Sequence, residues 1–254
     1  MTRLILLCLL LASCGGSRVA TDAVPAPRVT FGDRDPVDWG GRGPDAYPIH
    51  GVDLSRWQGQ LDWAAARRAG TSFAWIKATE GADRVDPMFA VNHDAAKSAG
   101  VAIGAYHFFY WCSSAENQAA WFIRNVPRRA GDLPPVLDLE WTPFSPTCTV
   151  RPPAGEVRDR ARRFLDIVER HYGQRPVIYT TREFYRETGI GQLGTDLWLR
   201  ATAEPVTDVY PGARWTVWQY SATGRVDGIA GDVDLNVFNG RTGDWAAWLA
   251  RRRQ

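Results

Sequence analysis

The sequence predicts an α/β protein: a TIM-like β/α barrel with eight strands and fewer helices in its C-terminal part. Beyond residue 47, short β-branched or aromatic runs alternate with longer segments of helical character, which is typical of repeated βα units. Eight such runs suit a closed barrel, and the helical segments shorten after Thr180. A doubly wound open sheet is the alternative, but the sequence lacks the glycine-rich dinucleotide fingerprint that such sheets usually carry.

The expected strands are runs rich in β-branched and aromatic residues. They cover residues 49–54, 73–78, 101–108, 135–139, 176–180, 196–199, 215–220 and 233–238. The expected helices cover residues 62–69, 87–99, 115–126 and 155–172. Asp62 and Asp86 are suitable N-caps, and Gly70, Gly100 and Gly173 follow three helices where a C-terminal glycine is favoured.

The first residues have the pattern of an export signal. Arg3 supplies a positive charge, and the apolar run that follows at residues 4–11 is too short to span a bilayer as a helix. The segment Leu11-Ala12-Ser13-Cys14 resembles the lipobox of bacterial lipoproteins, in which the cysteine is lipidated and becomes the first mature residue. We therefore expect a signal peptide at residues 1–13 and a lipid on Cys14 that anchors the protein to the bacterial cell envelope, on its periplasmic or outer-membrane face. An ordinary cleaved leader is the alternative.

Residues 14–47 contain several prolines, scattered charges and no sustained period, so they are predicted to form a flexible tether with some order near its end. The barrel is expected at residues 48–254. Because Cys8 lies in the leader and Cys14 would carry lipid, Cys112 and Cys148 remain as a pair in an oxidising compartment, and we expect a disulfide between them. Two unpaired buried thiols are the alternative.

Composition argues against several functions. The formal net charge of +2 is too close to neutral to indicate a nucleic-acid partner, and the sequence has no phosphate-binding glycine loop and no zinc-type cysteine spacing. We expect no cofactor, no metal and a monomer. The 12 tryptophans either fill a large barrel or present flat apolar faces to sugar rings.

The strand at residues 135–139 ends in an acid pair. Asp138 and Glu140 stand at positions i and i+2, so both side chains point to one side, with Cα atoms about 6.5–7 Å apart. Reactive groups of βα barrels stand at the carboxyl ends of strands. Repulsion between the two acids and desolvation by Trp141 should raise one pKa, as a general acid at a glycosidic oxygen requires. Salt bridges to loop arginines are the structural alternative.

Two further acids lie on the first and last predicted strands. The first strand contains Asp53 and the last contains Asp234. Because these strands are neighbours in a closed barrel, the two side chains are expected to meet across the seam. A hydrogen-bond network that closes the barrel is an alternative role, and it is compatible with a role in the site.

Taken together, these segments resemble glycoside hydrolase family 25, the lysozymes often called the Chalaropsis type. The resemblance runs from His50 to Phe238. Its segments are GVDLSRWQG at 51–59, LDW at 61–63, FAWIKATEG at 73–81, GAYHF at 104–108, DLE at 138–140, PVIY at 176–179, LW at 197–198, WQY at 218–220 and VDLN at 233–236.

The resemblance implies a barrel with fewer helices than strands that cleaves the β-1,4 bond between N-acetylmuramic acid and N-acetylglucosamine, with peptidoglycan strands as partner. It implies Glu140 as proton donor, Asp138 as stabiliser of the positive charge or internal intermediate at the sugar, and Asp53 and Asp234 as acids that orient and tune the pair. By the same resemblance the cleft would be lined by Tyr106, Lys77, Glu80, Tyr179, Trp198, Trp218 and Gln219.

Backbone spacing leaves the mechanism open among a protein nucleophile, inversion and attack by the substrate's own acetamido group, and we favour the last. The sequence departs from the family pattern at Leu199-Arg200-Ala201, where many relatives have a small and then an aromatic residue, and in the proline-rich loop at residues 142–153. A wall-binding lipoprotein without catalysis, and a glycosidase for another polymer of N-acetyl sugars, are the rival functions.

Overall fold

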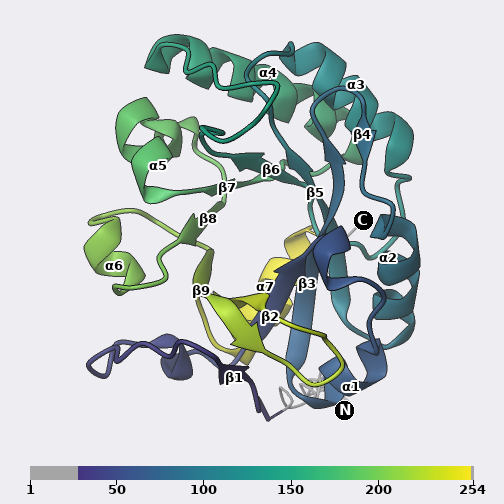
Figure 1. The fold of residues 1–254 in the computed structure, drawn as a ribbon, viewed down its shortest axis with the longest axis vertical. Coiled ribbons are helices and arrows are strands. Elements are labelled where there is room, and N and C mark those ends of the chain that lie inside the picture. Colours follow the sequence, from purple (N-terminus) through teal and green to yellow (C-terminus); the bar gives the residue numbers. More distant parts are fainter. Residues whose placement is uncertain (1–27, 253–254) are drawn as a thin grey trace, which may run out of the picture.

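The computed structural model describes residues 28–252, so the predicted signal peptide and Cys14 lie outside the described residues. Figure 1 shows a ring of strands with helices around its outside. The ring contains the eight strands β2 (His50–Leu54), β3 (Thr71–Glu80), β5 (Ala102–Phe108), β6 (Val136–Leu139), β7 (Val177–Thr180), β8 (Leu197–Arg200), β9 (Val217–Arg225) and β10 (Val233–Phe238). The predicted eight-stranded barrel is confirmed.

The direction of the last strand decides where its residues lie. Neighbouring strands are parallel from β2 round to β9, whereas β10 is antiparallel to both β9 and β2 and closes the ring. The first residues of β10 therefore lie at the same end of the barrel as the carboxyl ends of the other seven strands.

Helices follow most of the strands and become short after β7. The four predicted helices are α1 (Trp63–Arg68), α2 (Phe89–Ser98), α3 (Ala115–Asn125) and α4 (Ala154–Tyr172). After β7 and β8 come only α5 (Arg182–Thr188) and α6 (Val206–Val209), and β9 leads to β10 without a helix, which confirms the predicted decline. Asp62 caps α1 by accepting the Ala65 N–H at 2.9 Å, but Asp86 lies ahead of the N-cap of α2, which is Met88. The glycines predicted to follow three helices have positive φ.

The interior of the barrel is packed with aromatic rings. Trp75 of β3 and Trp198 of β8 lie 5.1 Å apart between ring centroids. A helix that the sequence analysis missed, α7 (Thr242–Arg252), closes the amino-terminal end, where Trp245 lies against Phe73 and Phe238. Nine of the 12 tryptophans are buried, so their number mainly reflects the core.

The predicted tether is folded over its second half. Residues 28–47 lie along the outer face of β9, at the lower edge of Figure 1, and β1 (Gly32–Asp33) pairs with β9. The Trp39 ring stands 5.1 Å from that of Trp218. Because no helix follows β9, this segment takes the place of one and buries an aromatic face that would otherwise meet water. The folded domain therefore starts by residue 28 and not at residue 48.

Two loops at the carboxyl end of the barrel are joined covalently. Cys112, after β5, is bonded to Cys148, after β6, with a Cα–Cα distance of 5.7 Å, so the predicted disulfide is confirmed. A short strand, β4 (Arg84–Val85), pairs with the end of β3.

Over residues 28–252, none of the helices has the length and apolar character that a membrane span would need.

Candidate active site

A cavity of about 390 Å³ opens at the carboxyl end of the barrel. Each of the eight strands, or the loop that directly follows it, contributes at least one side chain to its wall. The lining residues are Asp53, Ser55, Trp57, Lys77, Tyr106, Phe108, Asp138, Glu140, Tyr179, Thr181, Trp198, Arg200, Gln219 and Asp234. The cavity is therefore centred on the barrel axis and open to solvent at its mouth.

The acid pair of β6 faces this cavity as predicted. Leu137 and Leu139 alternate with the acids and are fully buried in the outer core. Asp138 is 7 % exposed, whereas Glu140 follows the strand and is half-buried at the mouth. Asp138 is therefore the deeper acid of the pair, and Glu140 is the outer one.

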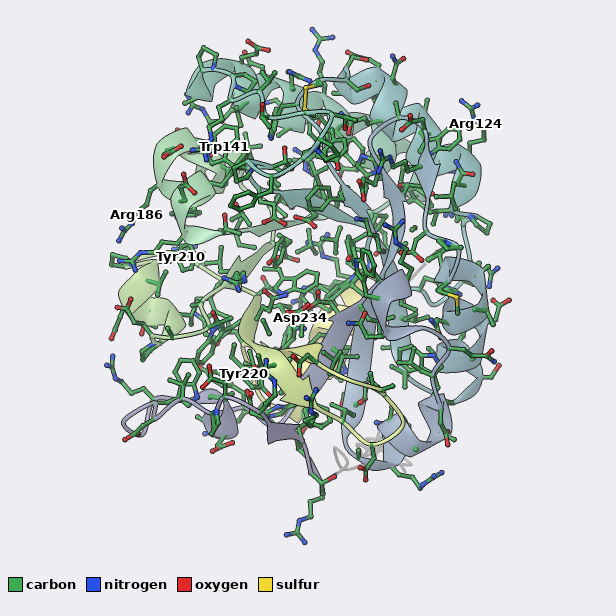
Figure 2. All side chains as sticks on the ribbon, viewed as in Figure 1. Arg124, Trp141, Arg186, Tyr210, Tyr220 and Asp234 are labelled. Atoms are coloured by element: carbon green, nitrogen blue, oxygen red, sulfur yellow. A yellow bond between two sulfur atoms is a disulfide. The ribbon has the colours of Figure 1, made fainter. Side chains whose placement is uncertain are left out.

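Trp141, which was predicted to desolvate the acids, does not line the cavity. Its ring packs against Phe184 at 4.5 Å and Trp111 at 6.0 Å, and its Nε1 donates to Glu187 at 2.8 Å. In Figure 2 it lies towards the outside of the molecule, away from Asp234 at the middle of the ring. The side chain of residue 141 points away from the cavity because directions alternate along an extended chain.

Asp53 and Asp234 meet across the seam, as expected from the sequence. They are paired neighbours in the register between β2 and β10. The Asp53 Oδ2 atom accepts hydrogen bonds from Gln219 Nε2 at 2.9 Å and Asn236 Nδ2 at 2.8 Å. Asp53 therefore both faces the cavity and joins β2 to β9 and β10.

The hydrogen-bond network continues to two aromatic side chains of the wall. Tyr179 donates its hydroxyl to Gln219 Oε1 at 2.9 Å, and Trp198 donates its Nε1 to Asn236 Oδ1 at 2.7 Å. The side-chain amides of Gln219 and Asn236 thus each accept a hydrogen bond from one aromatic residue and donate one to Asp53. The network fixes the position of that carboxylate.

The acids approach the cavity from opposite sides. In the ring of eight strands, β6 and β10 are separated by three strands on either side. Asp138 and Glu140 therefore face Asp53 and Asp234 across the mouth. A ligand bound at the mouth would lie between the two groups.

Burial dominates the electrostatics of these acids. It raises the pKa of Asp138 well above its usual range, and the Glu140 charge raises it further. Burial likewise raises the pKa of Glu140 to about 6, opposed by the charges of Arg200 and Lys77. It raises the pKa of Asp53 to about 6 and that of Asp234 to about 8. The site therefore holds protons at a pH where isolated carboxyl groups have lost theirs.

Five of the seven predicted cleft residues line the cavity, and a sixth lies beside it. Tyr106, Lys77, Tyr179, Trp198 and Gln219 line the cavity. Glu80 lies beside it: it forms an ion pair with Lys77, accepts the Tyr110 hydroxyl at 2.6 Å and lines an adjoining cavity of about 190 Å³.

Trp218 is not in the cleft. It is 1 % exposed on the outer face of β9, and its Nε1 donates to the Ala201 carbonyl at 2.7 Å. Because its neighbour Gln219 points inward, the alternation of a strand requires Trp218 to point outward.

Sequence reasoning missed five residues of the wall: Ser55, Trp57, Phe108, Thr181 and Arg200. Ser55, Trp57 and Phe108 lie within the quoted segments, and the i+2 spacing of Ser55 from Asp53 and of Phe108 from Tyr106 was the available signal for those two residues. The indole of Trp57 is 78 % exposed at the rim, with the Arg56 guanidinium 4.6 Å from its ring centroid.

The sequence profile described as "Glycosyl hydrolases family 25" matches residues 52–229. The chain belongs to glycosyl hydrolase family 25. The match includes Asp53, Asp138 and Glu140 but ends before Asp234, whose place in the site is given by its register with Asp53. As a family 25 member the chain is a glycoside hydrolase, and its paired acids are the group type that such an enzyme requires.

The chain is also similar to individual proteins, two of which are named lysozymes. The uncharacterized protein YegX of Escherichia coli K12 is 38% identical over 224 residues, covering 86% of this chain and 80% of YegX. Lysozyme M1 of Streptomyces globisporus is 38% identical over 211 residues, covering 77% of this chain and 69% of the lysozyme. The crystal structure of a bacterial lysozyme from Streptomyces coelicolor superposes with a TM-score of 0.71 at 35% identity, covering 80% of this chain and 97% of that one.

Proposed function

We propose that this family 25 domain is a lysozyme that hydrolyses the β-1,4 bond between N-acetylmuramic acid and N-acetylglucosamine in peptidoglycan. The observation that carries the proposal is the acid pair Asp138 and Glu140, in which burial raises the pKa of the proton donor Glu140 to about 6, in a cavity rimmed by the exposed indole of Trp57. Similarity to proteins named lysozyme supports the choice of substrate.

Glu140 is the proton donor in this proposal. It is the acid that stands at the open end of the cavity, where a glycosidic oxygen can reach it. Its O–H proton passes to that oxygen as the bond to the sugar C1 breaks, and the departing sugar leaves as an alcohol. The resulting carboxylate then accepts a proton from the water that completes hydrolysis.

Asp138 stabilises the sugar that becomes positively charged. Its Oδ1 atom is buried and has no hydrogen-bond partner among the described residues, which suits an acceptor that waits for a substrate N–H. The acetamido N–H of a muramic acid residue would supply that donor. The acetamido oxygen then attacks C1, water opens the cyclic intermediate, and the product keeps the configuration of the substrate.

Asp53 and Asp234 position and tune the pair from the opposite side of the mouth. The charge of Asp53 raises the pKa of Glu140, and Glu140 in turn raises that of Asp234. The two amide hydrogen bonds to Asp53 keep its charge in place. The charge of Lys77, which lies on β3 and pairs with Glu80, lowers the pKa of Glu140.

The function is tested with purified peptidoglycan and with chitin oligomers as substrates. A muramidase clears peptidoglycan suspensions and releases reducing ends, whereas a wall-binding protein sediments with the polymer and releases none. A glycosidase for another N-acetyl sugar polymer cleaves the chitin oligomers at the higher rate. Sedimentation without cleavage would overturn the proposal.

We infer that the enzyme is exported and held at the cell envelope by lipid on Cys14, because its substrate lies outside the cytoplasm and its N-terminus has a lipobox-like segment. Residues 15–27 precede the described domain and would link it to the anchor. Labelling cells with a fatty-acid probe tests this inference: the wild type should incorporate the probe and the Cys14→Ser variant should not. Equal labelling of both would refute it.

A further inference from the structure

Arg200 is a cation in the cavity wall without an acidic partner. It ends β8, and because side chains alternate along a strand, it points inward like Trp198 two residues earlier. Over residues 28–252, its guanidinium forms no ion pair and donates no hydrogen bond, although its backbone carbonyl accepts the Tyr210 hydroxyl at 2.7 Å. Its five N–H donors are therefore available to a ligand.

The other cation of the wall is already engaged. Lys77 pairs with Glu80 and lies 4.5 Å from the centroid of the Phe108 ring. It stands on β3, and Arg200 stands on β8, opposite to it in the ring of eight strands. Arg200 thus supplies a free positive charge on the side of the cavity that Lys77 does not reach.

The acids that surround Arg200 make this charge important for an anionic substrate. Asp53, Glu140 and Asp234 are the carboxyl groups whose titration its charge affects, and Asp138 completes the acidic wall. A carboxylate entering a cavity with four acids would be repelled unless a cation received it. A guanidinium can do so with two parallel N–H···O bonds.

We propose that Arg200 binds the free lactyl carboxylate of a muramic acid residue, so that the enzyme prefers glycan strands from which the stem peptides have been removed. This inference rests on the proposed function and names its substrate class. In peptide-bearing strands the lactyl carboxyl group is an amide and has no charge. A polymer of N-acetylglucosamine has no carboxylate at all.

Peptidoglycan offers a second source of carboxylates, the stem peptide itself. The position of Arg200 favours the lactyl group, because this residue lies inside the cavity wall at a strand end and not in a surrounding loop. The cavity volume of about 390 Å³ is at the small end of ligand sites and leaves little room for a peptide beside the sugar. A carboxylate attached directly to the sugar can reach Arg200 without one.

The test measures binding in an inactive background, so that it does not depend on turnover. Glu140→Gln and the double variant Glu140→Gln, Arg200→Gln are titrated by calorimetry with three glycans of equal length: peptide-free strands, the same strands methyl-esterified on the lactyl group, and strands with stem peptides. Glu140→Gln should bind the free acid about 10- to 100-fold more tightly than the ester. The double variant should bind both with similar affinity.

Arg163→Gln in the same background is the matched control, since Arg163 pairs with Glu116 at the surface and does not line the cavity. This control should keep the preference for the free acid. The proposal is overturned if Glu140→Gln binds acid and ester equally, if removing Arg200 leaves the preference intact, or if Arg200 instead favours the peptide-bearing strands. Failure of the proposed function is seen separately, as the absence of cleavage of any of the three glycans by the wild type.

Discussion

Replacing Glu140 by Gln removes the proposed acid with little change in shape. The amide keeps the size of the carboxyl group and loses the dissociable proton, so the variant should fold and bind glycan. General acid–base catalysis contributes about 10²- to 10⁴-fold to rates, which predicts a loss of kcat of that size, or roughly 3–5 kcal/mol of transition-state stabilisation.

The raised pKa of Glu140 also predicts how strongly the activity depends on pH. With a pKa of about 6, Glu140 is about 90 % protonated at pH 5 and about 10 % protonated at pH 7. Because the donor must carry its proton, wild-type activity should fall roughly tenfold between these pH values. In the Gln variant the residual activity should lack this decline.

The assay follows reducing ends released from purified peptidoglycan between pH 4 and pH 8. Glu116→Gln is the control, because Glu116 is an exposed acid on α3 that pairs with Arg163. Circular dichroism and thermal unfolding confirm that both variants are folded. A Glu140→Gln enzyme within tenfold of the wild type, or one that keeps the acid-dependent decline, would refute the assignment.

Four further predictions follow from individual contacts. Asp138→Asn should lower kcat about 100-fold, and proton NMR of the wild-type product should show the retained anomer first; an inverted first product would exclude the acetamido route. Asp234 holds its proton more tightly in the folded than in the unfolded state, because its pKa is raised to about 8, so fold stability should fall as pH rises from about 4 to 8. In urea unfolding, Asp234→Asn should therefore be more stable than the wild type at pH 8, on the order of 1 kcal/mol, with no gain at pH 4; an equal effect at both pH values would contradict this. Replacing Cys112 and Cys148, 36 residues apart, by serine should lower the free energy of unfolding by about 4 kcal/mol, and an unchanged denaturation midpoint would argue against the bridge. Trp39→Ala should cost about 2 kcal/mol if residues 28–47 are part of the domain, and nothing if they are a tether.

Much of the barrel could be predicted because its strands have local signals. All eight begin and end within a few residues of the expected positions, since β-branched and aromatic runs bounded by glycine, proline and polar residues mark them in the sequence. Closure then brings Asp53 beside Asp234, which followed from the order of the strands alone. The orientation of the acid pair of β6 into the cavity could be predicted from the alternation of side chains along the strand.

The remaining features depend on contacts between distant segments. Nothing local shows that residues 28–47 cover β9, because the need arises only from the missing helix between β9 and β10. Trp141 and Trp218 each follow or precede an inward-pointing residue, so the alternation of side chains along the strand turns both away from the cavity. Arg200 was noted only as a departure from the family pattern, and its lack of a partner became visible with the structure.

Mass spectrometry of peptidoglycan digested with the purified domain identifies which glycosidic bond the enzyme cleaves. A lysozyme leaves fragments whose new reducing end is N-acetylmuramic acid, and we expect such fragments from the wild type and none from Glu140→Gln. New reducing ends on N-acetylglucosamine, or an undigested polymer at pH 5, would contradict it.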